Sequence, residues 1–142
     1  MRHICVLGST GSIGVNTLQV VRAHPQLFKI AALTAHSNVE VLAQQCIEFK
    51  PELAVVGSAN AAQTLQNLLR AANIKTDVQY GPEALVSAST LASVDTVMAA
   101  IVGAAGLKPA MAAAKAGKRI LLANKETLVM SGSLFIQAVQ QG

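Results

Sequence analysis

The chain has 142 residues, of which 52% are hydrophobic and 13% are charged, and its formal net charge is +4. This length suits one domain with a buried core and is too short for two ordinary ones. With one Tyr, three Phe, no Trp and no stripe of basic residues, the sequence offers little for stacking on a nucleic acid, so we expect no nucleic-acid partner.

Short apolar runs alternate along the chain with segments of helical periodicity. The runs predict strands at His3–Leu7, Phe28–Leu33, Leu53–Val56, Asp77–Tyr80, Val94–Ile101 and Arg119–Ala123. The other segments predict helices at Ser12–Ala23, Val39–Phe49, Ala59–Ala72, Pro82–Ser89, Pro109–Ala116 and Leu128–Val139. This alternation is typical of a Rossmann-like α/β fold, a doubly wound, mainly parallel sheet with helices on both faces. Ligands of such sheets bind outside the carboxyl ends of the strands.

A glycine-rich segment, GSTGSIG at residues 8–14, directly follows the first predicted strand. Gly8 permits a tight turn, Gly11 lets the backbone approach a pyrophosphate, and Gly14 lets the next helix lie close to the sheet. The amides that would point at the anion from the helix N-terminus belong to Thr10, Gly11, Ser12 and Ile13. The alternative is a tight strand-to-helix turn without a ligand. A P-loop is excluded because no Gly-Lys-Ser/Thr follows.

The residues after the second predicted strand indicate which dinucleotide would bind. Residues 34–38 read TAHSN, without the carboxylate that would bind the ribose 2′-hydroxyl of NAD. Because a carboxylate there would also repel the 2′-phosphate of NADPH, its absence favours NADPH. No Arg or Lys stands there either, so His36, Ser37 and Asn38 would have to donate the hydrogen bonds. The alternative for His36 is an ordinary exposed loop histidine.

Two further strand ends are informative. Residues 99–106 are small and apolar, which leaves room for a flat nicotinamide ring or serves only tight packing. After the sixth predicted strand, Asn124 is a good N-cap, but Lys125 stands in a first helical turn, where a cation opposes the helix dipole. An anion facing Lys125 would explain it, and so would a solvated pair with Glu126.

Several classes of site and location are not favoured. Cys5 and Cys46 occupy apolar positions typical of buried, reduced thiols, which suits the cytoplasm. The first residues enter a predicted strand at once, with no long apolar stretch followed by a small-residue cleavage site, so we expect no export. The longest uncharged apolar stretch, near residues 96–107, is shorter than the roughly twenty residues that a membrane span needs. Because the acidic residues and histidines are dispersed, we expect no metal site and no catalytic acid–base pair here.

Three segments resemble the 1-deoxy-D-xylulose 5-phosphate reductoisomerase family. They are the glycine-rich loop with the following Thr17-Leu18, residues 97–107 (VMAAIVGAAGL) and residues 121–129 (LLANKETLV). The resemblance runs along the whole chain and implies that residues 1–142 are an NADPH-binding Rossmann-like domain. The catalytic, metal-binding and C-terminal domains would follow it, because the family's metal-binding Asp-Ser-Glu segment is expected just past Gly142. We therefore expect this chain alone to be inactive.

The resemblance also implies an activity and residue roles. The family converts 1-deoxy-D-xylulose 5-phosphate to 2-C-methyl-D-erythritol 4-phosphate in the non-mevalonate isoprenoid pathway, uses NADPH with Mg²⁺, Mn²⁺ or Co²⁺, and is inhibited by fosmidomycin. The resemblance further implies that the whole protein is a homodimer in the bacterial cytoplasm. By resemblance, residues 10–13 hold the NADPH phosphates, Asn124 and Glu126 contact the nicotinamide ribose side, and Lys125 touches the phosphorylated sugar substrate.

The sequence departs from the family pattern at one point. Many members have Gly-Lys-Asn or Gly-Arg-Asn where this chain has His36-Ser37-Asn38, so the resemblance supports a cofactor contact for Asn38 more than for the two residues before it. Two alternatives stay open: another NADP-linked reductase, of the semialdehyde or homoserine dehydrogenase type, and a non-catalytic nucleotide-sensing module.

Overall fold

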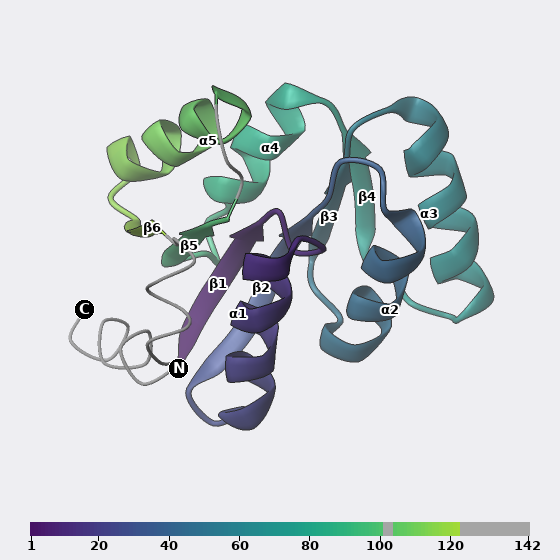
Figure 1. Ribbon diagram of the computed structural model, residues 1–142, viewed down its shortest axis with the longest axis horizontal. Helices are drawn as coiled ribbons and strands as arrows, with labels where there is room; N and C mark the ends of the chain where they lie inside the picture. Colours follow the sequence, from purple (N-terminus) through teal and green to yellow (C-terminus); the bar gives the residue numbers. More distant parts are fainter. Residues whose placement is uncertain (101–103, 123–142) are drawn as a thin grey trace.

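The computed structural model describes residues 1–100 and 104–122 of the chain, and strands and helices alternate along these residues (Figure 1). The strands are β1 (Arg2–Leu7), β2 (Phe28–Thr34), β3 (Leu53–Val56), β4 (Asp77–Tyr80), β5 (Thr96–Ala99) and β6 (Arg119–Leu122). The helices are α1 (Ser12–Ala23), α2 (Val39–Phe49), α3 (Ala59–Ala71), α4 (Pro82–Ser89) and α5 (Ala104–Lys115). No helix within the described residues is long and apolar enough to cross a bilayer.

The strands form one parallel sheet in the order β4-β3-β2-β1-β5-β6. The chain moves outward from β1 to β4 and then returns through α4 to β5, on the other side of β1 (Figure 1). Parallel crossovers are right-handed, so connections that run in opposite directions place their helices on opposite faces. The predicted doubly wound α/β fold is confirmed, and its strand order reverses between β1 and β5, where such sheets bind ligands.

The core consists of two apolar layers, one on each face of the sheet. Alternate residues of β1 divide between them because successive side chains of a strand point to opposite faces. Ile4 and Val6 pack in the layer with α1, α2 and α3, whereas Cys5 and Leu7 pack in the layer with α4 and α5. All four are fully buried. Burial on both faces explains why these strands are continuous apolar runs rather than alternating ones.

Strand β2 contains one extra residue relative to β1. Ile4 pairs with Ile30 and Cys5 pairs with Ala32, so Ala31 has no partner on β1. Ile30 and Leu33 consequently lie in the same core layer, although residues three positions apart point to opposite faces in a regular strand. This irregularity decides which face of the sheet the last side chains of β2 point to, just before the predicted cofactor segment.

The predicted boundaries were wrong in one region. The fifth strand covers only Thr96–Ala99, and the next helix begins at Ala104 rather than at Pro109. Proline is most common in a first helical turn, but Pro109 lies inside α5, where it has no N–H to donate. Its carbonyl accepts a hydrogen bond of 2.9 Å from the Ser89 hydroxyl of α4, a contact between helices that local sequence cannot reveal. The predicted helix at 128–139 lies outside the described residues.

Candidate dinucleotide-binding cleft

A cleft of about 520 Å³ lies at the carboxyl ends of the strands, within the usual size range of small-molecule sites. It is bounded by the glycine-rich loop after β1, the ends of β2, β3 and β5, and the start of α4. Its lining consists of Gly8, Thr10, Gly11, Thr34, Ala35, His36, Val56, Gly57, Gly81, Pro82, Leu85 and Ala100. No acidic side chain is among these residues.

The glycine-rich loop folds as its three glycines require. Gly8 has a φ of +84°, the left-handed region that favours glycine. A Cβ on Gly14 would lie 2.2 Å from the Gly8 carbonyl oxygen, so α1 packs directly against the loop. A Cβ on Gly11 would have, among residues 1–100 and 104–122, only that same oxygen within 4 Å, at 3.8 Å, and Gly11 lines the cleft. The free space next to Gly11 is therefore cleft space, available to a ligand.

Helix α1 begins in a way that leaves its amides available to an anion. Its N-cap is Gly11, and no side chain in the described part of the chain caps it. By contrast, the Asn38 side chain accepts from Val41 N in α2 and the Ser58 side chain caps α3. The first amides of a helix have no partner within the helix, and the dipole favours negative charge there. Thr10 and Gly11 line the cleft itself. The predicted Ser12 and Ile13 form the first turn of α1 next to it.

Two buried side chains that the sequence analysis missed anchor this loop. The Thr34 hydroxyl accepts from Gly8 N at 2.9 Å, and the Thr34 carbonyl accepts from Ser9 N at 2.7 Å. The Ser9 hydroxyl donates to Gln45 Oε1 at 2.7 Å, and Gln45 Nε2 donates to the Ser9 carbonyl at 2.9 Å. The sequence feature that could have pointed to Gln45 is its place next to the apolar positions of its helix, where a glutamine needs hydrogen-bond partners. These bonds link the loop to both β2 and α2.

The predicted 2′-phosphate segment lies at the next strand end. His36, Ser37 and Asn38 are all exposed, and only His36 lines the cleft. The His36 ring lies against Gly57, where a Cβ would stand 2.5 Å from His36 Nδ1, and Gly57 N donates to the His36 carbonyl at 2.8 Å. Asn38 Oδ1 accepts from Val41 N at 3.4 Å, which leaves the Asn38 amide hydrogens to donate elsewhere. The segment offers hydrogen-bond donors and no carboxylate.

The remaining wall of the cleft is apolar and comes partly from α4. Val56, Leu85 and Ala100 supply aliphatic surface suited to a flat ring, and Gly81 turns into α4 with a φ of +95°. Sequence analysis missed Val56, Gly81 and Leu85 because nothing local indicates that α4 reaches over the sheet. Ala100 belongs to the small-residue stretch 99–106. The residues of this stretch from Ala104 onward are the start of α5, and residues 101–103 lie outside the described residues.

Other predicted features can be placed only in part. Asn124, Lys125 and Glu126 lie outside the described residues. Within residues 1–100 and 104–122, no three His, Cys, Asp or Glu side chains come together as a metal site.

Cys5 and Cys46 are free and buried as predicted, and burial raises the pKa of each thiol to about 12. Both thiols are therefore structural rather than reactive.

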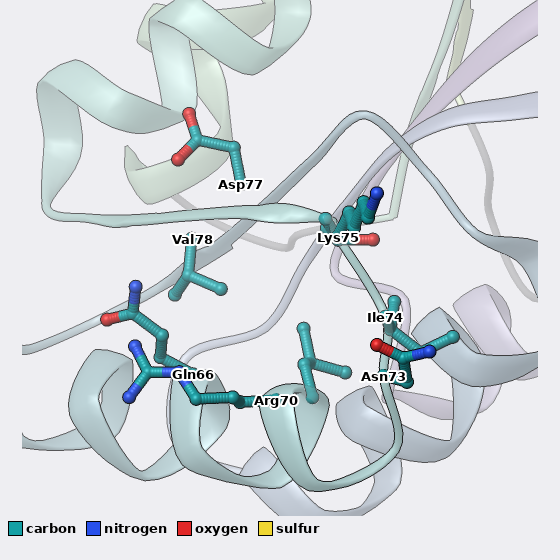
Figure 2. Close-up of a pocket in the computed structure, with 9 residues that line it drawn as sticks. Gln66, Arg70, Asn73, Ile74, Lys75, Asp77 and Val78 are labelled. Carbon is teal, nitrogen blue, oxygen red and sulfur yellow. The ribbon is translucent and has the colours of Figure 1, made fainter.

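A second hollow, of about 400 Å³, lies between α3 and the start of β4 (Figure 2). Figure 2 shows Gln66 and Arg70 of α3 beside Val78, while the Asp77 carboxylate lies on the other side of the strand. The hollow lies at the amino end of β4, away from the carboxyl ends where parallel sheets bind ligands. No predicted cofactor residue lines it, so we place the candidate site in the glycine-loop cleft.

Comparisons of the sequence with a family model and with curated proteins all point to one enzyme family. A sequence model of the family described as 1-deoxy-D-xylulose 5-phosphate reductoisomerase matches residues 4–132. The curated enzyme of that name from Cupriavidus taiwanensis is 58% identical over 141 residues, covering 99% of this chain and 36% of the relative. The one from Janthinobacterium sp. strain Marseille is 59% identical over 139 residues, covering 98% and 36%. The chain thus spans about a third of the length of these relatives.

Solved structures agree in fold. A crystal structure of DOX-P reductoisomerase in complex with NADPH, fosmidomycin and magnesium superposes with a TM-score of 0.83 at 43% identity, covering 99% of this chain and 34% of that one. The 1-deoxy-D-xylulose 5-phosphate reductoisomerase from Zymomonas mobilis in complex with NADPH gives a TM-score of 0.80 at 39% identity, covering 99% and 36%.

Proposed function

The chain belongs to the 1-deoxy-D-xylulose 5-phosphate reductoisomerase family, and on this premise we propose that residues 1–142 form the NADPH-binding domain of such an enzyme. The whole protein would convert 1-deoxy-D-xylulose 5-phosphate to 2-C-methyl-D-erythritol 4-phosphate in the non-mevalonate pathway. The observation that supports this most directly is the uncapped start of α1 beside an apolar cleft. Family membership also disfavours the semialdehyde or homoserine dehydrogenase alternative.

The residues of the cleft fit a dinucleotide. The amides of residues 10–13 bind the diphosphate, because they are unpaired helix-start donors next to a glycine without a Cβ. His36 and Asn38 donate toward the 2′-phosphate, and the absence of a carboxylate there lets that dianion approach. The aliphatic wall of Val56 and Leu85 accepts the adenine ring. Bound NADPH supplies the hydride, while the protein binds and orients the cofactor.

The reacting end of the site draws on residues 124–126. By family resemblance, Asn124 and Glu126 contact the nicotinamide ribose side and Lys125 binds the anionic sugar phosphate, which accounts for a cation in what the sequence predicts as a first helical turn. The described residues do not fit a metal site, so we assign the ligands of Mg²⁺, Mn²⁺ or Co²⁺ to the rest of the protein. We further propose a homodimer located in the bacterial cytoplasm.

Calorimetric titration of the chain with NADPH and, separately, with NADH tests the proposed function. We expect saturable NADPH binding that is tighter than NADH binding, because no carboxylate at residues 36–38 favours the 2′-hydroxyl. Absent NADPH binding, or equal binding of both nucleotides, would contradict the proposal. Residues 1–142 alone should show no turnover with substrate and metal, whereas the intact protein should, an outcome that would rule out a sensing module.

A further inference from the structure

Helix α2 contacts both halves of the candidate cleft, and Gln45 makes one of these contacts. The first residues of α2 follow directly from the His36–Asn38 segment, whose His36 forms one rim of the cleft. Two turns later, Gln45 reaches Ser9 in the glycine-rich loop. The rim that faces the 2′-phosphate and the loop that faces the diphosphate are therefore joined through one helix.

The contact between Gln45 and Ser9 is reciprocal and buried. Ser9 is 0% exposed and Gln45 is 7% exposed. The Gln45 amide accepts from the Ser9 hydroxyl and donates to the Ser9 carbonyl, so both ends of the amide are used. The Ser9 hydroxyl also approaches the Thr34 carbonyl at 3.2 Å. A buried amide is costly unless it is paired, and a helix that only needed packing would have an apolar residue here, as at its buried neighbours Leu42 and Cys46.

Ser9 is the residue immediately before the amides assigned to the diphosphate. Its own N–H is bonded to the Thr34 carbonyl, and its carbonyl to Gln45 Nε2, so the peptide groups on both sides are held. The direction of the next amide, that of Thr10, depends on the plane of the Ser9 carbonyl because the peptide group is planar. Holding that carbonyl fixes the Thr10 N–H as well.

We propose that Gln45 is a positioning residue of the dinucleotide site: through Ser9 it orients the diphosphate-binding amides and keeps them in register with the 2′-phosphate rim. This inference rests on the proposed function and deepens it. Gln45 does not line the cleft, so it acts on the site through Ser9. Its role is to hold the loop in its anion-binding conformation before the ligand arrives. Binding then carries no entropic cost for ordering the loop.

The test compares two ligands in the intact protein that contains this sequence. NADPH uses the loop, the rim and the aliphatic wall, whereas adenosine 2′-monophosphate lacks the diphosphate and uses only the rim and the wall. Gln45→Met keeps the side-chain length and removes both hydrogen bonds, and Gln44→Met makes the same change at the adjacent, exposed position of α2. We expect Gln45→Met to weaken NADPH binding about tenfold, as two lost hydrogen bonds would, and to leave adenosine 2′-monophosphate binding within about twofold. Gln44→Met should change neither.

A second variant keeps the inference testable if Gln45→Met does not fold. Ser9→Ala removes the donor to Gln45 Oε1 and keeps the Ser9 carbonyl, so it should weaken NADPH binding less than Gln45→Met and again spare adenosine 2′-monophosphate. Equal weakening of both ligands would reveal a merely structural role and overturn the inference, as would unchanged NADPH binding in either variant. If the unmodified protein fails to bind NADPH, the proposed function itself is wrong.

Discussion

Gly14 stands so close to Gly8 that a Cβ on Gly14 would lie 2.2 Å from the Gly8 carbonyl oxygen and 2.6 Å from Ser9 Cα. These neighbours are backbone atoms, which cannot rotate away. Gly14→Ala should therefore destabilise the fold by about 1–3 kcal/mol, as overpacking does, despite the better helix propensity of alanine. Urea unfolding measures the change, and an unaltered midpoint would show that α1 does not pack against the loop in this way.

Gly11→Ala separates binding from stability. The new Cβ would be 3.8 Å from its nearest protein neighbour, at a φ of −77° that alanine adopts freely, so the unfolding free energy should change by less than about 1 kcal/mol. In the cleft, however, that methyl group would occupy space that a diphosphate needs. We expect NADPH affinity to fall about tenfold or more, measured by calorimetry. Full NADPH affinity in this variant would remove the main support for the proposed site.

His36→Asp should change which nucleotide the cleft prefers. A carboxylate at this exposed cleft residue would repel the 2′-phosphate and could accept from a 2′-hydroxyl. NADPH binding should weaken about tenfold while NADH binding stays constant or improves. Gln26→Glu adds the same charge at an exposed residue before β2. This residue lies at the amino ends of the strands, away from the cleft, so the change should alter neither affinity. Equal effects of His36→Asp on both nucleotides would contradict a 2′-phosphate contact.

Thr34→Val tests the anchor between β2 and the loop. Thr34 is 1% exposed, and its hydroxyl accepts from Gly8 N, so valine would leave that partly buried N–H without this partner. The expected loss of stability is about 1–3 kcal/mol. Thr64 is exposed and donates only to the Asn60 carbonyl in its own helix, so Thr64→Val should cost less than about 0.5 kcal/mol. Comparable losses in the two variants would argue against the anchor.

The burial of Cys5 and Cys46 should make the folded chain less stable in alkali. Burial raises the pKa of each thiol from 9.0 to about 12, so the folded state disfavours the thiolate. Their contribution to stability is full below pH 9 and is lost as the pH rises from about 9 toward 12. At pH 8 a thiol reagent should label neither cysteine in the folded chain and both in urea. Rapid labelling of the folded chain would show that one thiol is accessible.

Local sequence predicted most elements of the fold. Burial on both faces makes parallel strands continuous apolar runs, and the spacing of Gly8, Gly11 and Gly14 predicted the turn and the close helix. The start of α5 was missed because Pro109 is a helix-start signal, and its position inside a helix depends on contacts such as that with Ser89. Local propensity is overridden wherever tertiary packing contributes more free energy.

By itself, therefore, the sequence determined the fold class, the glycine-rich loop and the absence of a carboxylate at residues 36–38, because each is a property of consecutive residues. Only the tertiary structure decided that Gln45 holds Ser9, that Thr34 anchors Gly8 and that α4 brings Leu85 to the cleft. Such contacts join residues distant in the chain, and the parallel crossovers that bring them together leave no local pattern in the sequence.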